Sequence, residues 1–534
     1  MTTNTVTQRD PALVAGLEFL AGLPLANPVL AEQKLIEYLD RLLAEPPAAA
    51  TLMALLEQAR YPLSFVEEEL AKRYQKRAQP LADEEEACFQ RVTDAWEKME
   101  RGYATCARLQ QPEPDNPQFT TLIATIVHRC LYYSGMTIFE HFRARREVPP
   151  GLWLDLHGYF ATAEEWQVTN TPVNDALEND LQATHCSAAY LTVQLIEVAS
   201  PYGCSARDLA LIRRWANMWA PLVSIHPLDN EYEVPPYLIE LLRDLPLHPT
   251  GGAEHIGEDA RRLDMSRLGL QISHMVAQLH QRLTPTQLGL GEDTSGHVIR
   301  LLERLSRPWT QSASPRRFRR FPSAGSAKVA VGMGAIHFFV GGGKEFIHAE
   351  QGSVYSRSEF EELYTFRERV MPNEPLAMKP RSDFAAEGWA VINHSANGFR
   401  LSRGSAGSRI AHEQLLAVCP HDGEQFLLAQ ITWLMEEIED KSIVAGLSVL
   451  PGIPTAVAAR VQAGEGGQSE RFVPAFLLTA VPAINEEASL VLPSGTYQPS
   501  RILEIQGEGG SVLVRMKSMR VRGSDFDRVT YEPV

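Results

Sequence analysis

The chain has 534 residues, 44% of them hydrophobic and 22% charged, and its formal net charge is −16. A single hydrophobic core stops growing at roughly 250 to 300 residues, so this length predicts two or three domains. The composition excludes collagen-like and wholly disordered proteins, and the acidic charge argues against a general affinity for DNA or RNA through counterion release.

The cysteines and the apolar runs indicate the cellular compartment of the protein. Six cysteines are scattered along the chain without a CxxC pair, which disfavours both a disulfide framework and a thiolate zinc site. Glu18 and Pro24 interrupt the N-terminal apolar stretch, and no run of about 18 apolar residues occurs elsewhere. We therefore expect a cytoplasmic protein with no integral membrane segment.

Up to residue 310 the apolar residues recur at helical spacing, as in Leu35, Leu39 and Leu42. Clusters of Pro, Gly, Asn and Asp separate the helical runs. We find no fixed repeat period, which argues against a regular solenoid. This half of the chain is therefore predicted to be an irregular array of about ten helices.

After a Ser-, Pro- and Arg-rich stretch at 311–326, short runs rich in Val, Ile and Phe are typical of strands. We predict strands at Lys328–Val331, Ile336–Val340, Trp389–Asn393, Phe399–Leu401, Leu415–Val418, Phe426–Trp433 and Ile443–Leu450. Many short strands with Gly-rich turns favour a small barrel or sandwich. Beyond a Gly-, Gln- and Ser-rich stretch near 463–469, further strands are predicted at Ala475–Ala480, Leu490–Leu492, Arg501–Ile505 and Val512–Met516.

The candidate motifs for nucleotide binding and metal binding do not have the residue spacing that these motifs require. The Gly-rich segment at 331–344 has Phe338 where a Walker loop needs Gly, and His337 where a GxGxxG motif needs it. His274 and His280 are six residues apart and lie on different helix faces. We therefore assign no catalytic residue, no metal ligand and no cofactor. An enzyme in the helical half stays an alternative, without a recognisable constellation of residues.

Two motifs remain. Between Arg304 and Lys328 there are seven basic residues and no acidic one, and the RxxxR sequence Arg316–Arg320 lies in this stretch. The second motif is NxSxxG at Asn393–Gly398, at the end of an apolar strand. Taken alone, the RxxxR motif is weak, because Arg300 and Arg304 form another match. The alternative is a basic interdomain linker beside an accidental NxSxxG at a strand end. Their order and their strand context make the pair more specific.

Together the motifs resemble those of the PilZ family of bacterial cyclic di-GMP receptors, over about residues 314–460. The strand at Phe426–Trp433, followed by a strand that contains Gly446, also looks like the strand–Trp–strand–Gly progression of that barrel. The resemblance implies ligand-binding roles for Arg316, Arg320, Asn393, Ser395 and Gly398, and auxiliary roles for Arg317 and Arg319.

The expected fold is an α+β multidomain protein. It has an α-helical domain at 1–310, a basic flexible linker at 311–326, a PilZ-like antiparallel β-barrel at 327–462 and a small β-rich C-terminal unit at 470–534. The two motifs are about 70 residues apart, far more than one strand pair needs. We place an insertion in the barrel at about 341–387.

The chemistry of this ligand fits these residue types. A cyclic dinucleotide presents two phosphates and two guanines, which guanidinium groups can bind in bidentate fashion and stack on. Asn393 and Ser395 can bond a guanine edge, and Gly398 permits a positive φ and a close backbone approach. We expect a non-enzymatic receptor that relays the level of cyclic di-GMP to a protein partner through the helical domain, in motility, biofilm or envelope control. The alternative is a degenerate PilZ-like scaffold that binds no nucleotide.

Overall fold

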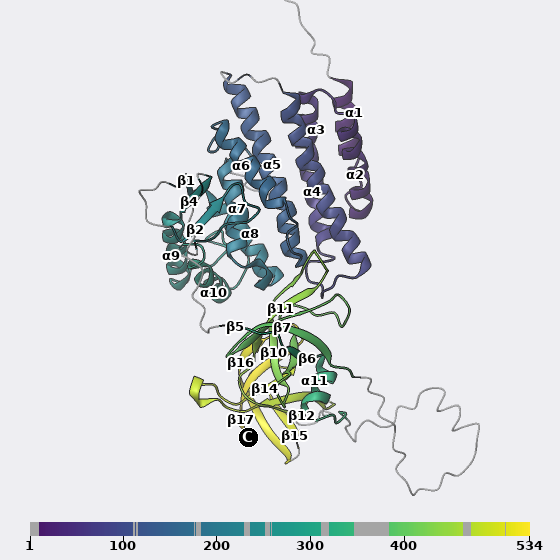
Figure 1. The fold of residues 1–534 in the computed structure, drawn as a ribbon, viewed down its shortest axis with the longest axis vertical. Coiled ribbons are helices and arrows are strands. Elements are labelled where there is room, and N and C mark those ends of the chain that lie inside the picture. Colours follow the sequence, from purple (N-terminus) through teal and green to yellow (C-terminus); the bar gives the residue numbers. More distant parts are fainter. Residues whose placement is uncertain are drawn as a thin grey trace, which may run out of the picture. The chain divides into compact units, whose positions relative to one another are not determined.

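The computed structural model describes residues 10–110, 113, 116–175, 177, 183–228, 235–250, 257, 259–310, 320–346, 384–462, 471–507 and 509–534. These residues form two compact units (Figure 1). The helical unit comprises Met1–Arg316 and Met435–Glu439, and the barrel unit comprises Arg317–Leu434 and Asp440–Val534.

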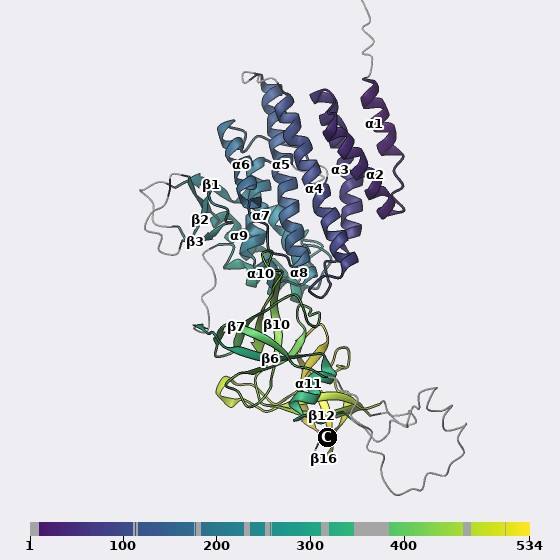
Figure 2. The same ribbon diagram turned by 45° about the vertical axis from the view of Figure 1, so that its right-hand side comes forward.

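The helical unit is built around one long buried helix. Its helices are α1 (Pro11–Ala21), α2 (Pro28–Ala44), α3 (Ala49–Ala71), α4 (Asp83–Leu109), α5 (Pro117–Ala144), α6 (Leu152–Glu165), α7 (Cys186–Val198), α8 (Ala206–Trp219), α9 (Ser266–His280) and α10 (Ser295–Ser306). Figures 1 and 2 show α3, α4 and α5 side by side. Every residue of α5 from Ile126 to Phe142 is buried, as expected for a helix surrounded by other helices. No helix in the described ranges is both long and apolar enough to cross a membrane.

A small antiparallel sheet interrupts the helices, which the sequence analysis did not predict. It consists of β1 (Ser224–Pro227), β2 (Tyr237–Glu240), β3 (His248–Pro249) and β4 (Ala260–Asp264), in the order β1-β4-β2-β3. The prediction of an all-α first half is therefore wrong in this segment. Strands of two to five residues are too short to show a clear period of two.

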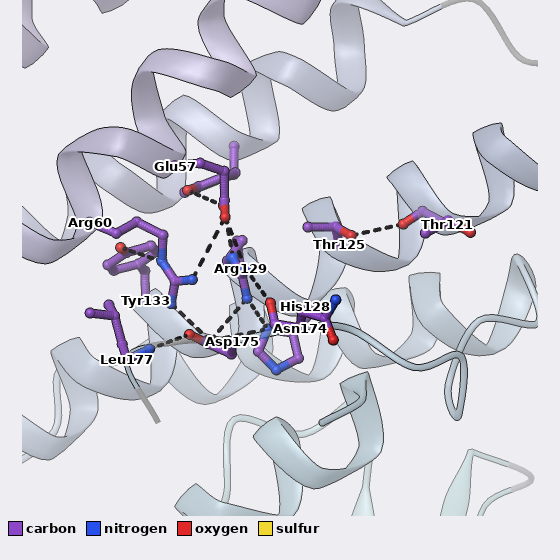
Figure 3. A network of polar contacts seen from close by, with 11 residues as sticks. Glu57, Arg60, Thr121, Thr125, His128, Arg129, Tyr133, Asn174, Asp175 and Leu177 are labelled. Atoms are coloured by element: carbon purple, nitrogen blue, oxygen red, sulfur yellow. Dashed lines mark hydrogen bonds and ion pairs between the residues drawn. The ribbon is translucent and has the colours of Figure 1, made fainter. Parts of the chain in front are cut away.

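A buried ionic network holds the segment after α6 against α3 and α5 (Figure 3). Asp175 is fully buried and accepts hydrogen bonds from Arg60 Nη2 at 2.8 Å and Arg129 Nη1 at 2.9 Å. Burial opposes ionisation of Asp175, but the two guanidinium groups hold its pKa below its usual value. Burial and the charge of Arg129 lower the pKa of His128 to about 3, so this imidazole is neutral.

The barrel unit begins with a sheet whose two edges meet. Its strands are β5 (Phe321–Pro322), β6 (Ser326–Val331), β7 (Glu387–Ser395), β8 (Gly398–Arg403), β9 (Leu415–Pro420), β10 (Leu427–Glu436) and β11 (Ile443–Val449). The order is β5-β7-β6-β9-β10-β11-β8, and an additional β7–β8 pairing closes the first barrel. Inward-facing residues such as Val329, Trp389 and Leu401 form its core.

The predicted strand at Ile336–Val340 is wrong, because these residues belong to helix α11 (Met333–Val340). Gly332 has a φ of 87° and separates β6 from the helix. A short apolar run does not distinguish a strand from a buried helix, since both can be apolar throughout. Ile336 is fully buried in a cluster with Phe476 and other residues of the second barrel.

The second barrel is closed and has six strands. These are β12 (Pro454–Val461), β13 (Val473–Leu478), β14 (Ser489–Pro493), β15 (Ile502–Gly507), β16 (Gly510–Arg522) and β17 (Phe526–Pro533), in the order β12-β13-β14-β17-β16-β15. β12 pairs with β13 and β15, so this barrel begins before the boundary expected at residue 470. The chain is thus an α+β multidomain protein, as predicted. Most of the expected linker at 311–326 and of the insertion at about 341–387 lies outside the described residues.

Candidate functional site

A β-bulge places the NxSxxG motif on the outer face of the first barrel. Val391 of β7 pairs with Leu401 of β8 in the core, but the register then shifts by one residue, so that Asn393 pairs with Arg400. Cross-strand partners point to the same face of a sheet, and successive residues point to opposite faces. The bulge at Ile392 therefore turns Asn393, and with it Ser395, away from the core.

Strands β8 and β11 approach each other closely at Gly398, and this position therefore requires glycine. It pairs with Ser395 across the turn formed by Ala396 and Asn397. A Cβ at this position would lie 2.2 Å from the Leu447 carbonyl oxygen of β11, so a side chain cannot be accommodated there without a backbone shift. Gly398 is not among the described glycines with positive φ, so the neighbouring strand β11, and not a special turn, is what requires glycine here. Its predicted role in ligand binding stays a prediction.

Strand β5 brings the end of the basic segment to the same place. Phe321 pairs with His394, and Pro322 pairs with Asn393. Arg320 directly precedes β5 and is exposed, and its side chain lines a pocket together with Asn393 and Ser395. The other predicted arginines, Arg316, Arg317 and Arg319, lie outside the described residues.

Two further side chains complete the site. The Arg400 guanidinium carbon lies 5.4 Å from the centre of the Trp433 ring, which is a cation–π contact. A Cβ on Gly446 would lie 1.8 Å from Trp433 Nε1, so only glycine leaves room for the indole over β11. The Arg400 Nε is buried and has no hydrogen-bond partner among the described residues.

The sequence analysis missed Arg400 and noted Trp433 and Gly446 only as part of the barrel pattern. The signal for Arg400 was its place two residues after the NxSxxG motif, but its neighbours across the sheet depend on strand register. Arg400 is opposite Asn393 on one side and opposite Gly446 on the other. This row crosses the β7–β8 hairpin and β11, and β11 is distant in sequence from that hairpin.

These residues surround one pocket of about 180 Å³ on the first barrel. Its lining consists of Arg320, Asn393, Ser395, Asn397, Gly398, Phe399, Arg400, Thr432, Trp433, Gly446, Leu447 and Ser448. Two guanidinium groups, two amides, hydroxyl groups and an indole are present, and no carboxylate occurs among the described lining residues. The pocket is therefore suited to a planar, anionic ligand with hydrogen-bonding edges. We find no group of three or more His, Cys, Asp or Glu side chains in the described residues that could hold a metal ion.

A closed antiparallel barrel that carries an NxSxxG hairpin, with a basic segment entering beside that hairpin, defines a PilZ-type barrel protein. Comparison with known proteins agrees. A family model for the N-terminal domain of the cyclic-di-GMP receptor FimW matches residues 15–230. Models for the middle PilZ domain and the C-terminal β-barrel domain of the same receptor match residues 243–372 and 457–534.

A curated relative supports the same assignment. The cyclic-di-GMP receptor FimW of Pseudomonas aeruginosa is 23% identical over 430 residues, which cover 72% of this chain and 69% of the relative. Over these three consecutive ranges the chain is similar to PilZ-containing receptors with a helical N-terminal domain. The resemblance read from the two motifs is thereby confirmed.

The matched ranges and the barrels differ in their boundaries. The middle match ends at residue 372, so it includes β5, β6 and α11 but not the hairpin at Asn393–Gly398. The last match begins within β12, in agreement with the start of the second barrel. These matches therefore do not test the predicted ligand-binding residues Asn393, Ser395 and Gly398.

Proposed function

We propose that the protein is a receptor that binds cyclic di-GMP in the pocket of the first barrel. One observation carries the proposal: Arg320 at the start of β5 lies in the same pocket as Asn393, Ser395 and Gly398 of the β7–β8 hairpin. The family models and the Pseudomonas relative, which are named for a cyclic-di-GMP receptor, support it.

In this proposal the two faces of the ligand meet different groups. Arg320, together with Arg316 upstream of it, bonds phosphate or the O6/N7 edge of a guanine, and Arg317 and Arg319 are auxiliary contacts. Asn393 and Ser395 bond a guanine edge from the barrel surface. Gly398 keeps the surface flat, because a side chain there would displace β11.

Arg400 adds a stacking platform that the motif alone does not contain. The Arg400 guanidinium group lies over the Trp433 ring, and in this proposal a guanine ring of the ligand stacks on that group. Its buried Nε–H needs an acceptor, and a ligand phosphate or carbonyl oxygen supplies one. The retained arginines, amide and hydroxyl disfavour the alternative of a degenerate scaffold.

We further propose that the receptor binds cyclic di-GMP without consuming it, acts in the cytoplasm and passes its signal to a protein partner through the helical unit. All six cysteines are buried and free, which supports a reducing compartment. Incubation of the protein with cyclic di-GMP and Mg²⁺ or Mn²⁺, followed by chromatography, tests the first point. Appearance of a linear dinucleotide contradicts it.

Isothermal titration of the purified chain with cyclic di-GMP tests the central proposal. Arg316→Ala and Arg320→Ala each remove a charge-assisted contact, which costs about 1.5 to 3 kcal/mol, or roughly a 10- to 150-fold loss of affinity. Lys328→Ala is the matched control, because Lys328 is an exposed basic residue of β6 that does not line the pocket. Absence of binding by the wild type refutes the proposed function, and unchanged affinity in both arginine variants refutes the site.

A further inference from the structure

The pocket of the first barrel is lined by two asparagines and a serine of one hairpin. Asn393 and Ser395 are at the end of β7, and Asn397 is in the turn before β8. The proposed function gives roles to the first two residues and none to Asn397. The hydrogen bonds within the hairpin decide which donors and acceptors each side chain can still offer a ligand.

The Ser395 hydroxyl group is already a donor within the hairpin. It donates to Asn397 Oδ1 at 3.1 Å, and the Gly398 carbonyl oxygen lies 3.4 Å from the same Oγ. A hydroxyl group has one hydrogen and two lone pairs, and both of these neighbours are acceptors. Toward a ligand, Ser395 therefore acts as a hydrogen-bond acceptor.

The Asn397 amide has the opposite role. Its Oδ1 faces Ser395, and its NH₂ group, on the other side of the same carbon, donates to no residue that the structure describes. The backbone of this residue is held as well, because its carbonyl oxygen accepts a hydrogen bond from Val449 N–H at 2.9 Å. Since Asn397 lines the pocket, it offers a ligand a donor from a position that is set before binding.

Asn393 differs from these two residues. Its side chain forms no hydrogen bond with any described residue, so its amide is free to turn and present either its oxygen or its NH₂ group. An amide that turns can bond an edge of guanine or an edge of adenine. The Ser395–Asn397 pair, by contrast, has a fixed order of acceptor and donor.

Guanine and adenine have opposite polarity on the edge that carries ring positions 1 and 6. Guanine has an acceptor at O6 and a donor at N1–H, whereas adenine has a donor at N6 and an acceptor at N1. The NH₂ group of Asn397 matches O6, and the Ser395 oxygen matches N1–H. With adenine, donor would face donor and acceptor would face acceptor, so these groups would lose their bonds to water without replacement.

We propose that Asn397 determines the specificity of this pocket for guanine over adenine, and that Ser395 orients its donor group. This inference rests on the proposed function and adds a residue at one of the unspecified positions of NxSxxG. Hypoxanthine also has O6 and N1–H, so the ligand class is a cyclic dinucleotide of 6-oxopurines. The free amide of Asn393 adds affinity without this discrimination.

Isothermal titration of the full chain with cyclic di-GMP, cyclic di-AMP and the hypoxanthine analogue of cyclic di-GMP tests the inference. The wild type should bind cyclic di-GMP at least about 100-fold more tightly than cyclic di-AMP, because two contacts are mismatched with adenine. The hypoxanthine analogue should bind within about tenfold of cyclic di-GMP, since it lacks only the 2-amino group.

Asn397→Asp replaces the donor with an acceptor, which suits the amino group of adenine. We expect the ratio of the affinities for cyclic di-GMP and cyclic di-AMP to decrease at least about tenfold. Both ligands carry the same two phosphates, so the repulsion by the added charge cancels in this ratio. Ala396→Asp is the matched control, because Ala396 is exposed in the same turn and does not line the pocket. It adds the same charge and should leave the ratio within about twofold of the wild-type value.

Asn397→Ala should also decrease the ratio, because it removes the donor without adding a charge. Melting temperatures check that the variants fold, and Asn397→Ala remains decisive should Asn397→Asp unfold. An unchanged ratio in the Asn397 variants, an equal decrease in Ala396→Asp, or a hypoxanthine analogue that binds as weakly as cyclic di-AMP overturns this inference and leaves the proposed function standing. Absence of cyclic di-GMP binding by the wild type refutes both.

Discussion

Asn393 of β7 is directly opposite Arg400 of β8, on the outer face of the first barrel. A one-residue bulge produces this pairing, since without it Asn393 would have the same inward orientation as Val391. The bulge therefore places the NxSxxG motif next to the Arg400 cation, which lies over the Trp433 ring. The predictions below begin with this row of residues.

We predict that Arg400→Ala lowers the affinity for cyclic di-GMP by about tenfold, because it removes a stacking platform and a charged donor. Arg400→Lys should not restore affinity, since an ammonium group lacks the planar face of a guanidinium. Isothermal titration measures both variants. Equal affinities of wild type and Arg400→Ala would exclude Arg400 from the site.

Gly446→Ala should disturb the first barrel, because the added Cβ meets the Trp433 indole at 1.8 Å. We expect a loss of about 1 to 3 kcal/mol in the free energy of unfolding of the barrel unit, together with weaker binding of cyclic di-GMP. Gly388→Ala in β7 is the control, since a Cβ there meets nothing within 4 Å. Denaturant unfolding followed by Trp fluorescence gives the comparison, and similar stabilities of the two variants would contradict the prediction.

Glu67 should make the helical unit less stable as the pH rises. Its side chain is fully buried, neither carboxyl oxygen has a hydrogen-bond partner among the described residues, and burial raises its pKa well above the usual value. Above a pH of about 4.5 the Glu67 carboxyl loses its proton in the unfolded state but keeps it in the folded state. The free energy of unfolding of the helical unit therefore decreases as the pH rises. Glu67→Gln should remove that part of the slope and be more stable than the wild type at pH 7.

Thermal unfolding at several pH values between about 4 and 8 measures this slope. Glu18→Gln serves as the control, because Glu18 is exposed on α1. A pH dependence that is the same in Glu67→Gln and the wild type would show that Glu67 does not cause it.

Asp175→Asn should strongly destabilise the helical unit. The substitution leaves Arg60 and Arg129 buried with one fewer carboxylate (Figure 3), and breaking a buried ion pair from one side costs about 3 to 5 kcal/mol. Urea unfolding followed by far-ultraviolet circular dichroism tests this, with Asp155→Asn on the exposed side of α6 as the control. A loss no larger than in the control would show that Glu57 alone compensates the two cations.

The sequence by itself determined the features that depend on local pattern. Apolar spacing identified most of the helices before residue 310, and runs of Val, Ile and Phe identified most strands of the two barrels. The motif at Asn393–Gly398 and the basic segment before Phe321 indicated the PilZ resemblance, because they depend only on residue order. Short apolar runs were ambiguous, as α11 shows.

Only the tertiary structure decided which side chains meet. Arg400 joins the site because β8 is paired with β7 on one side and β11 on the other, and Trp433 reaches it because Gly446 leaves room. Strand register and helix packing come from the burial of many non-local contacts at once, so no single stretch of sequence carries them.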